Sequence, residues 1–213
     1  MIVAIECAST DSSVALAAPD GRPIAVEGWS AGHRQGHEVL PRLMALLERH
    51  GVPLGELTAL AVGTGPGSFT GLRVGMSVAK GLAYGLDRPI VGVPSLAAWL
   101  RAEPEAAAAV GRAGARDAYL LVRGETEIRV IAADDLTVEL RSAVVAAPRE
   151  LADAFGLLAA RAPLEAASAV AQAAAEELAA SPGGDDLALL EPGYLRLPRG
   201  IRPVDASEVI RWP

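Results

Sequence analysis

A glycine-rich loop at residues 63–71 is the segment of this chain with the clearest potential for chemistry. From residue 63 to residue 75 the sequence reads GTGPGSFTGLRVG, between an apolar run and a helix-like run from about Leu72 to Gly85. Such a loop could bind an anion, because the first turn of a helix has free N–H groups and a partial positive charge. The lysine of a P-loop and the spacing of a dinucleotide fingerprint are both missing. A tight turn with glycines at positive φ accounts for the same residues, so both interpretations stay open.

The helix-like run after the loop has a row of small residues at steps of four: Gly71, Gly75, Ala79 and Ala83. These residues share one face of a helix, and a face without long side chains lets another backbone approach closely. The row predicts either close packing on the chain's own sheet or contact with a partner subunit. Glycine inside a helix costs about 1 kcal/mol relative to alanine, so Gly75 and Gly81 each need a packing or binding reason.

Few other residues have the types and spacing of a catalytic or metal site. His33 and His37 lie four apart, as two ligands on one helical face would, but only Glu38 is available as a third ligand. We therefore interpret them as polar residues at the start of a helix and expect no metal. Cys7 lies in an apolar run and is expected to be a buried small residue rather than a nucleophile. No catalytic set of serine, histidine and aspartate stands out.

Composition and charge exclude several classes of protein. The chain has 213 residues, with 19 Lys plus Arg against 26 Asp plus Glu, which gives a formal charge of −7. A single cysteine excludes a disulfide framework and a cysteine-rich zinc site. No apolar run approaches about 20 residues and no basic stretch precedes the first one, so we expect a cytoplasmic protein without membrane span or signal peptide. The negative charge argues against tight binding of nucleic acid by this chain alone.

The pattern of the first hundred residues predicts one α/β lobe that positions the glycine-rich loop. Three short apolar runs joined by turn residues predict an antiparallel meander, and helices then alternate with buried parallel strands. The order βββαβαβα is that of the ribonuclease-H-like lobe of the actin, sugar kinase and heat-shock ATPase superfamily, whose members usually have two such lobes. The expected strands are 2–7, 13–18, 23–29, 57–63 and 89–93, and the expected helices are 37–50, 72–85 and one from 94.

The second half is expected to form a smaller, abbreviated version of the first lobe, which divides the chain into domains at 1–100 and 101–213. The alanine-rich segment 103–115 is expected to be a linker plus a helix. The other expectations are strands at 118–122, 127–132, 136–140 and 187–190, and helices at 148–155 and 163–180, each opened by a proline.

Several segments resemble the TsaB (YeaZ) family. They are IVAIECAS from residue 2, LAVGTGPGSFTGLRVG from residue 60, AKGLA from residue 79 and GVPSL from residue 92. The GPGSFTGLRVG block is highly specific for this family and its catalytic relative TsaD, and its Phe-Thr pair favours TsaB. The resemblance covers residues 1 to about 100 and resumes at EPGYLR from residue 191.

The resemblance implies a non-catalytic scaffold in bacterial tRNA modification. TsaB pairs with TsaD and, together with the ATPase TsaE, supports threonylcarbamoylation of the adenosine next to the anticodon. ATP and metal are then expected on TsaD and TsaE, with no cofactor on this chain, and tRNA contact is indirect. TsaB pairs with TsaD, or with itself when alone, through its first two helices. The implied interface residues are Leu40, Leu43, Leu47, Gly65, Pro66, Gly67, Ser68, Phe69, Thr70, Gly71, Arg73, Gly75, Met76, Ala79, Lys80 and Ala83.

Two departures from the family pattern bear on catalysis. The first strand ends in Glu6-Cys7-Ala8-Ser9, where the family usually has Asp-Thr-Ser-Thr and where the superfamily uses the aspartate near a nucleotide-bound metal. TsaD places its metal-binding histidines after the glycine-rich loop, whereas this chain has no histidine after His50. Both departures favour a scaffold over the alternative, an ATPase or glycoprotease-like metallopeptidase of the same superfamily. Direct contact with tRNA is a third hypothesis, which the net charge disfavours.

Overall fold

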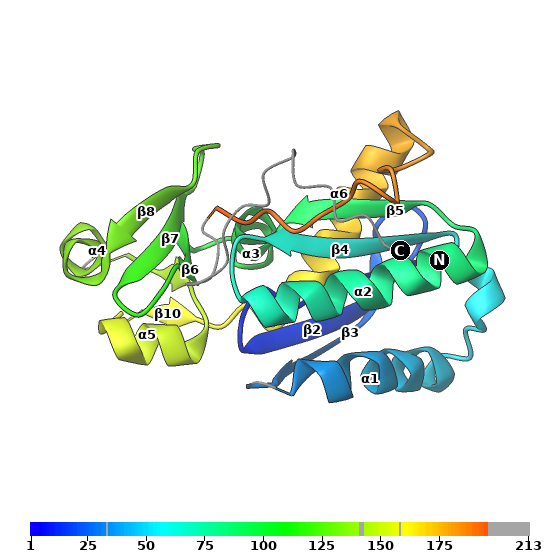
Figure 1. Cartoon of the computed structure of the whole chain (residues 1–213), viewed down its shortest axis with the longest axis horizontal. Coiled ribbons are helices and arrows are strands. Elements are labelled where there is room, and N and C mark those ends of the chain that lie inside the picture. Colours follow the sequence, from blue (N-terminus) through cyan, green and yellow to red (C-terminus); the bar gives the residue numbers. More distant parts are fainter. Residues whose placement is uncertain (33, 141–142, 158, 196–213) are drawn as a thin grey trace, which may run out of the picture.

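Two five-stranded sheets lie one after the other along the longest axis of the molecule (Figure 1). The computed structural model describes residues 1–32, 34–140, 143–157 and 159–195. The first sheet has the order β3-β2-β1-β4-β5, in which β1 pairs antiparallel with β2 and parallel with β4. Its strands are β1 (Ile2–Glu6), β2 (Asp11–Ala17), β3 (Pro23–Ser30), β4 (Ala59–Gly65) and β5 (Ile90–Pro94).

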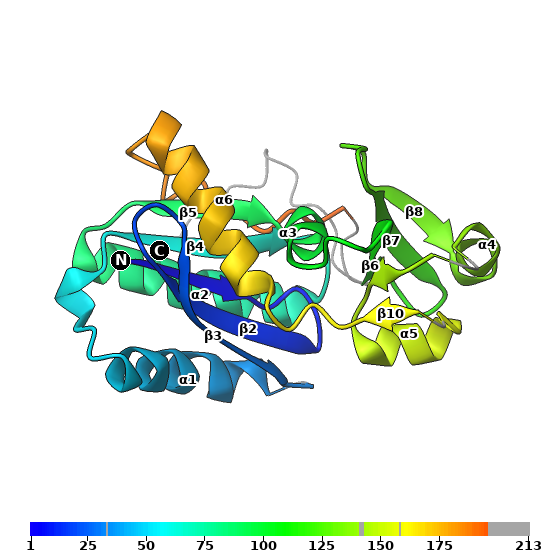
Figure 2. The ribbon, with the colours of Figure 1, turned by 180° about the vertical axis from the view of Figure 1, so that it is seen from behind.

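Helices cover both faces of the first sheet. Strands β1 and β2 are buried along their whole length, which explains why their sequences are almost continuously small or apolar. On one face pack α1 (Gln35–Arg49) and α2 (Phe69–Leu86), and on the other α3 (Ser95–Ala102) and α6 (Ala166–Ala180). Figure 2 shows α6 lying across the strands from behind. A short 3₁₀ helix, η1 (Leu54–Glu56), leads from α1 toward β4.

The second sheet is smaller and has the order β10-β9-β6-β7-β8. One of its faces packs against α4 and α5, around the buried side chains of Val110, Leu136 and Phe155. Its other face packs toward α3 around Trp99. Its elements are β6 (Ala108–Arg112), β7 (Asp117–Val122), β8 (Arg129–Ala132), α4 (Ala133–Glu139), β9 (Val145–Ala146), α5 (Arg149–Phe155) and β10 (Ala160–Arg161).

The structure confirms the predicted two-lobe α/β architecture and the order βββαβαβα of the first lobe. It corrects where the glycine-rich loop ends. Helix α2 begins at Phe69 rather than near Leu72, because the hydroxyl of Ser68 caps it by accepting the Gly71 N–H at 3.2 Å. Phe69 and Thr70 are therefore helical. Before the helix, Gly65 closes β4 with a φ of 92°, a value that favours glycine.

Three predictions for the second half are wrong. The segment 103–115 contains strand β6 and no helix, because Ala108, Ala109 and Val110 are buried between the two layers of the second lobe. Residues 136–140, predicted as a strand, lie mostly in helix α4, of which Leu136 is the buried residue. Residues 187–190 form a turn instead of a strand. The predicted strands at 118–122 and 127–132 and the helices at 148–155 and 163–180 correspond to β7, β8, α5 and α6.

The chain returns to the first sheet after building the second one. Helix α6 packs against β1, β2 and β4, and its alanines approach the strands closely. The backbone N–H of Ala167 donates to Ser13 Oγ at 3.0 Å. A boundary at residue 100 thus separates the two sheets but not the helices that cover them. Among the described residues no helix has the length and apolarity to cross a membrane.

Candidate partner interface

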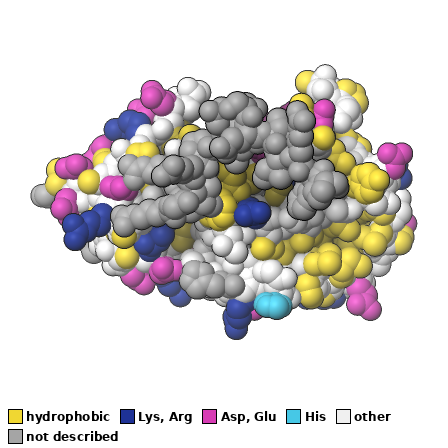
Figure 3. Space-filling model, viewed as in Figure 1, with side chains coloured by type: hydrophobic (Ala, Val, Ile, Leu, Met, Phe, Trp, Pro, Cys, Tyr) yellow, Lys and Arg dark blue, Asp and Glu magenta, His cyan; other side chains and the backbone are white. Residues whose placement is uncertain are grey.

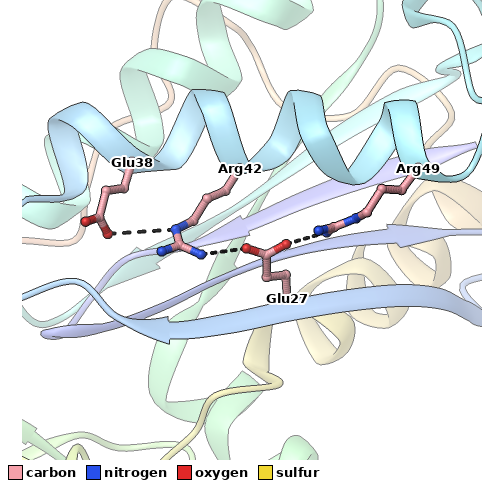
Figure 4. A network of polar contacts seen from close by, with 4 residues as sticks. All are labelled: Glu27, Glu38, Arg42 and Arg49. Atoms are coloured by element: carbon pink, nitrogen blue, oxygen red, sulfur yellow. Dashed lines mark hydrogen bonds and ion pairs between the residues drawn. The ribbon is translucent and has the colours of Figure 1, made fainter.

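Helices α1 and α2 lie side by side on the first sheet. Ion pairs connect α1 to β3, the edge strand of that sheet. Its buried face consists of Val39, Leu43, Leu46 and Leu47. Toward strand β3 the side chains form the chain of ion pairs drawn in Figure 4. Those pairs link α1 to the edge strand β3.

Glu27 on β3 is the centre of this network. Its carboxylate accepts from Arg42 at 2.7 Å and also from Arg49, while Arg42 lies 3.8 Å from Glu38. The two guanidinium groups, Arg49 first, lower the pKa of Glu27. The Arg42 guanidinium carbon also lies 4.7 Å from the ring centroid of Trp29, a cation–π distance. A network that combines several charges is worth more than an isolated surface pair.

The row of small residues on α2 packs on the chain's own sheet, which corrects the predicted interface. A Cβ at position 71 would overlap the carbonyl oxygen of Cys7, so only glycine fits there. Gly75 also faces Cys7, and Ala79 and Ala83 are buried in the core cluster of the first lobe. We call these four residues the inner row. Of the two alternatives that the sequence left open, internal packing is the correct one.

The other predicted interface residues divide by exposure. Leu43 and Leu47 are buried because they form the inner face of α1, and Met76 because it joins the same core. The buried members of the prediction are Leu43, Leu47, Gly65, Pro66, Gly71, Gly75, Met76, Ala79 and Ala83. The exposed members are Leu40, Thr70 and Arg73, and the half-buried ones are Gly67, Ser68, Phe69 and Lys80. Contact with a partner stays a prediction for the exposed and half-buried members.

A second row of small residues on α2 faces outward, and the sequence reasoning missed it. Ser77, Gly81 and Gly85 follow one another at steps of four and are all exposed. A Cβ at position 81 or 85 would meet no atom of the described residues within 4 Å, so nothing in that part of the chain requires glycine at either position. We call these three residues the outer row. The sequence did contain one signal for the outer row: a glycine at position 81 destabilises a helix, and no reason for it was apparent.

Large apolar side chains flank the outer row. Leu40 and Met44 on α1 are 43% and 39% exposed, and Tyr84 on α2 is 81% exposed. Val74 and Val78 are half-buried and pack against the core of the first lobe, and a Cβ at Gly36 of α1 would lie 3.9 Å from Val74. Figure 3 shows hydrophobic side chains gathered over the α1–α2 half of this face. A row of small residues beside exposed apolar side chains is a surface that lets a second helix approach closely.

Lys80, a predicted interface residue, also binds a distant segment of its own chain. Its Nζ donates to the carbonyl oxygens of Leu190 at 3.0 Å and Ala188 at 3.5 Å. The segment 185–195, which we call the strap, is also bonded to the first sheet. Asp185 accepts from the Gly92 N–H at 2.7 Å, and Gly193 donates to Thr64 at 2.8 Å.

The strap ends against the start of α2. The ring of Tyr194 lies 5.1 Å from that of Phe69, and the guanidinium carbon of Arg73 lies 5.2 Å from the same Phe69 ring. The EPGYLR segment noted in the sequence is therefore part of this stack, except for Arg196, which lies outside the described residues. Phe69 thus contacts the strap as well as lining the cleft between the lobes.

A cleft of about 870 Å³ lies between the two lobes. Its walls are the turn 8–10, residues 67–69 at the start of α2, the hairpin 112–119 and the start of α5. Arg112 and Glu150 form an ion pair at 3.3 Å across part of it. Both arginines and carboxylates line this cleft, so it has no dominant positive charge for a phosphate. Within the described residues no three His, Cys, Asp or Glu side chains group as metal ligands.

The acidic residue of the first strand does not face this cleft. Glu6 is 1% exposed and its Oε1 accepts the Ala8 N–H at 2.7 Å. Burial raises the pKa of Glu6 to about 7, while the Ala8 N–H and the side chains of Ser95 and Trp99 act in the opposite direction. Burial, with Glu6 beside it, also raises the pKa of the Cys7 thiol to about 12. A thiol with this pKa is not a nucleophile at neutral pH, as the sequence predicted for Cys7.

One of the two histidines four apart in the sequence can be placed in the structure. His37 is exposed in the first turn of α1, and His33 lies outside the described residues. His50 follows the end of α1, where its Nδ1 lies 2.9 Å from the Leu46 carbonyl oxygen.

Comparison with known proteins adds to this geometry. Residues 30–185 match the family model described as TsaD, tRNA N6-adenosine threonylcarbamoyltransferase. The chain is 40% identical over 105 residues to the tRNA threonylcarbamoyladenosine biosynthesis protein TsaB of Escherichia coli strain K12. That match covers 45% of this chain and 40% of the E. coli protein, so the matched part is less than half of that relative.

Two solved structures are similar over almost their whole length. A protein from Pseudomonas aeruginosa with similarity to the peptidase YeaZ has a TM-score of 0.66 and 26% identity, covering 92% of this chain and 99% of that one. YeaZ from Pseudomonas aeruginosa has a TM-score of 0.65 and 25% identity, covering 91% and 99%. The family model covers more than half of the chain, and the TsaB and YeaZ likenesses agree with it. The chain therefore belongs to the family described as TsaD, tRNA N6-adenosine threonylcarbamoyltransferase, and within it is similar to the TsaB (YeaZ) proteins.

Proposed function

We propose that this chain is a non-catalytic scaffold subunit in tRNA threonylcarbamoyladenosine biosynthesis, and that it binds a TsaD subunit through α1 and α2. The observation that carries the proposal is the outer row of α2. Gly81 and Gly85 each weaken the isolated helix by about 1 kcal/mol, and no neighbour among the residues that the structure describes explains them. Close approach of a partner helix between Leu40, Met44 and Tyr84 supplies the missing reason.

The chemistry around the glycine-rich loop supports a scaffold rather than an enzyme. Ser68 caps α2, and Glu6 is buried against the sheet instead of pointing into the cleft. No histidine follows His50 in the sequence, so the metal-binding pair that the TsaD resemblance implies has no counterpart here. ATP and metal would act on the TsaD and TsaE partners.

The assembly we propose contains TsaD and TsaE in the cytoplasm, with tRNA bound mainly by the partners. Alone, the chain would pair with a second copy of itself through the same α1–α2 face. A symmetric pairing brings the outer row against its own copy, because a two-fold interface uses the same patch on both subunits. The homodimer and the TsaD complex would then compete for one surface.

A charge placed beside the outer row tests the interface. Met44→Glu should weaken both self-association and binding to the same organism's TsaD by at least about tenfold, because it buries an unpaired carboxylate in an apolar contact. Sedimentation velocity and co-purification measure the two associations. Val138→Glu is the matched control, since Val138 is also an exposed apolar helical residue but lies on α4 in the second lobe. Equal binding by the Met44→Glu variant would contradict this interface.

A reconstituted modification assay tests the scaffold role. TsaD and TsaE of the same organism should threonylcarbamoylate tRNA only when this chain is added, and Met44→Glu should lower that stimulation in step with its binding. The purified chain alone should hydrolyse no ATP and no peptide. Turnover by the isolated chain that is lost in Glu6→Ala would instead establish the ATPase or metallopeptidase alternative.

A further inference from the structure

Glu6 is a buried carboxyl group at a junction of three elements. It ends strand β1 and is 1% exposed. One carboxylate oxygen, Oε1, accepts the N–H of Ala8 at 2.7 Å. The other, Oε2, lies over Gly63 of β4 so closely that a Cβ at position 63 would overlap it. The same Cβ would lie 2.7 Å from Ser95 Oγ at the start of α3, so Oε2 and the Ser95 hydroxyl are neighbours.

From this junction two connections run to the start of α2. On one side the Ala8 N–H binds Glu6, and the Ala8 carbonyl oxygen accepts the N–H of Ser68 at 2.6 Å. A Cβ at position 67 would overlap this carbonyl oxygen, so the loop is in direct contact with the turn. On the other side Ser95 Oγ accepts the N–H of Gly65 at 2.9 Å. Both ends of the 65–68 segment are therefore anchored to groups that contact Glu6.

We propose that Glu6 is a positioning residue for helix α2, because its carboxyl group holds the turn at Ala8 and the loop at Gly65 in register. The inference rests on the proposed function, since the helix so positioned presents the outer row to the partner. Its carboxylate takes no part in a reaction. Glutamate at this position is long enough to reach both Ala8 and the side of Ser95, and it turns away from the cleft.

The charge of Glu6 changes the hydrogen bonds available at this junction. Neither Oε2 nor the buried indole N–H of Trp99 makes a hydrogen bond of normal geometry, although Trp99 and Ser95 face the carboxylate. An ionised carboxylate can only accept hydrogen bonds, whereas the protonated group donates one through its hydroxyl. In that state the hydroxyl of Glu6 can donate to Ser95 Oγ, which has two lone pairs and can still accept from Gly65. The two charge states therefore offer the Ser95 hydroxyl, and through it the loop, different hydrogen bonds.

The groups that face Glu6 from each neighbouring element are uncharged. They are Gly63 on β4, Ser95 and Trp99 on α3, and the thiol of Cys7, which directly follows β1 and whose pKa is raised. Desolvation raises the pKa of Glu6 to about 7, and the described surroundings contribute no opposing charge. The position of α2 should accordingly depend on pH near neutrality.

Hydrogen exchange in the isolated chain tests the positioning role without any partner. Glu6→Gln keeps the size of the side chain but removes its charge, and Ser95→Ala removes the second connection while leaving Glu6 intact. At one fixed pH, both variants should exchange the Gly65 N–H about tenfold faster than wild type, with a smaller effect at Ser68 in Ser95→Ala. Glu125→Gln, an exposed glutamate in the second lobe, should change neither. Exchange rates equal to those of wild type at Gly65 and Ser68 in both variants would overturn the proposal. If Glu6→Gln fails to fold, wild-type rates in Ser95→Ala would overturn it.

Two further measurements separate this inference from the proposed function. The carboxyl carbon of Glu6, followed by NMR, should titrate with a midpoint near pH 7. Self-association of wild type should change with the same midpoint, whereas that of Glu6→Gln should not vary between pH 6 and pH 8. If the wild type binds no partner at any pH, the proposed function fails while the exchange result still decides the role of Glu6. A partner affinity that is independent of pH in wild type would contradict control of α2 by Glu6.

Discussion

At the scale of single residues, glycines on one helix face different surroundings. The carbonyl oxygen of Cys7 occupies the place where a Cβ of residue 71 would lie, whereas a Cβ at residue 75 would sit 3.4–3.6 Å from Cys7 and Ile5, at ordinary contact distance. A Cβ at residue 81 would meet nothing. Residue 71 must therefore be glycine, and residue 75 has only a weak requirement for it. Among the described residues nothing requires glycine at position 81.

These surroundings predict opposite effects of the same substitution. Gly71→Ala should lower the free energy of unfolding by about 2–3 kcal/mol, because backbone cannot move aside as a side chain can. Gly75→Ala should be neutral or raise it by up to about 1 kcal/mol, because alanine is the better helix former. Urea unfolding of both variants measures the difference. Equal destabilisation by the two would show that α2 is held away from β1 in solution.

Glu6 gives stability a dependence on pH. Its pKa is about 7 in the folded chain against an ordinary value of 4.5 in the unfolded chain, so between these values the folded chain binds more protons. The free energy of unfolding therefore falls as pH rises from about 4.5 to 7, by on the order of 3 kcal/mol from this group. Glu6→Gln should show a flatter profile over this range in chemical unfolding. A parallel profile for wild type and variant would mean that Glu6 has an ordinary pKa.

At the scale of elements, the two faces of α2 have different surroundings. Its inner row packs on β1 and β4, and its outer row faces solvent beside α1. Both rows consist of small residues at steps of four, so periodicity alone could not decide which one meets the sheet. The sequence left open whether the row that begins at Gly71 packs on the sheet or meets a partner, and the family resemblance implied the partner. The structure places that row on the chain's own sheet.

The outer row predicts a separation of stability from association. Gly81→Ala should raise the free energy of unfolding of the monomer by about 1 kcal/mol, because the added methyl group meets nothing and the helix gains propensity. Gly81→Leu should leave the monomer folded but weaken self-association by at least about tenfold, because its side chain occupies the space of the partner helix. Calorimetry on dilute protein and sedimentation of concentrated protein measure the two quantities. Unchanged association in Gly81→Leu would place the interface elsewhere.

At the scale of the whole molecule, local pattern predicted the first lobe better than the second. Strands β1, β2 and β4 have continuous small or apolar runs, and α1 has a clear apolar face, so each element follows from its own residues. In the second lobe alanine suits a strand as well as a helix when it is buried, which is why β6 was predicted as helix. Strands β9 and β10 are two residues long and leave no pattern to detect.

Contacts between residues far apart in sequence were also beyond local reasoning. The bond of Lys80 to Leu190 joins residues 110 positions apart, and that of Arg149 N–H to Asp11 joins residues 138 apart. Helix α6 covers the first sheet although it follows the entire second sheet in the chain. Residues 1–102 alone would therefore expose the apolar face of the first sheet that α6 covers.

The anchoring of the strap by Lys80 gives the chain a natural chemical reporter. Lys80 is the only lysine in the sequence, so an acylating reagent finds two amines, the amino group of Met1 and this one. Its Nζ is engaged by Leu190 and Ala188, and acylation requires a free, neutral amine. The rate at which this single side chain is acylated, read by peptide mass, therefore measures how often the strap leaves α2, without any introduced label.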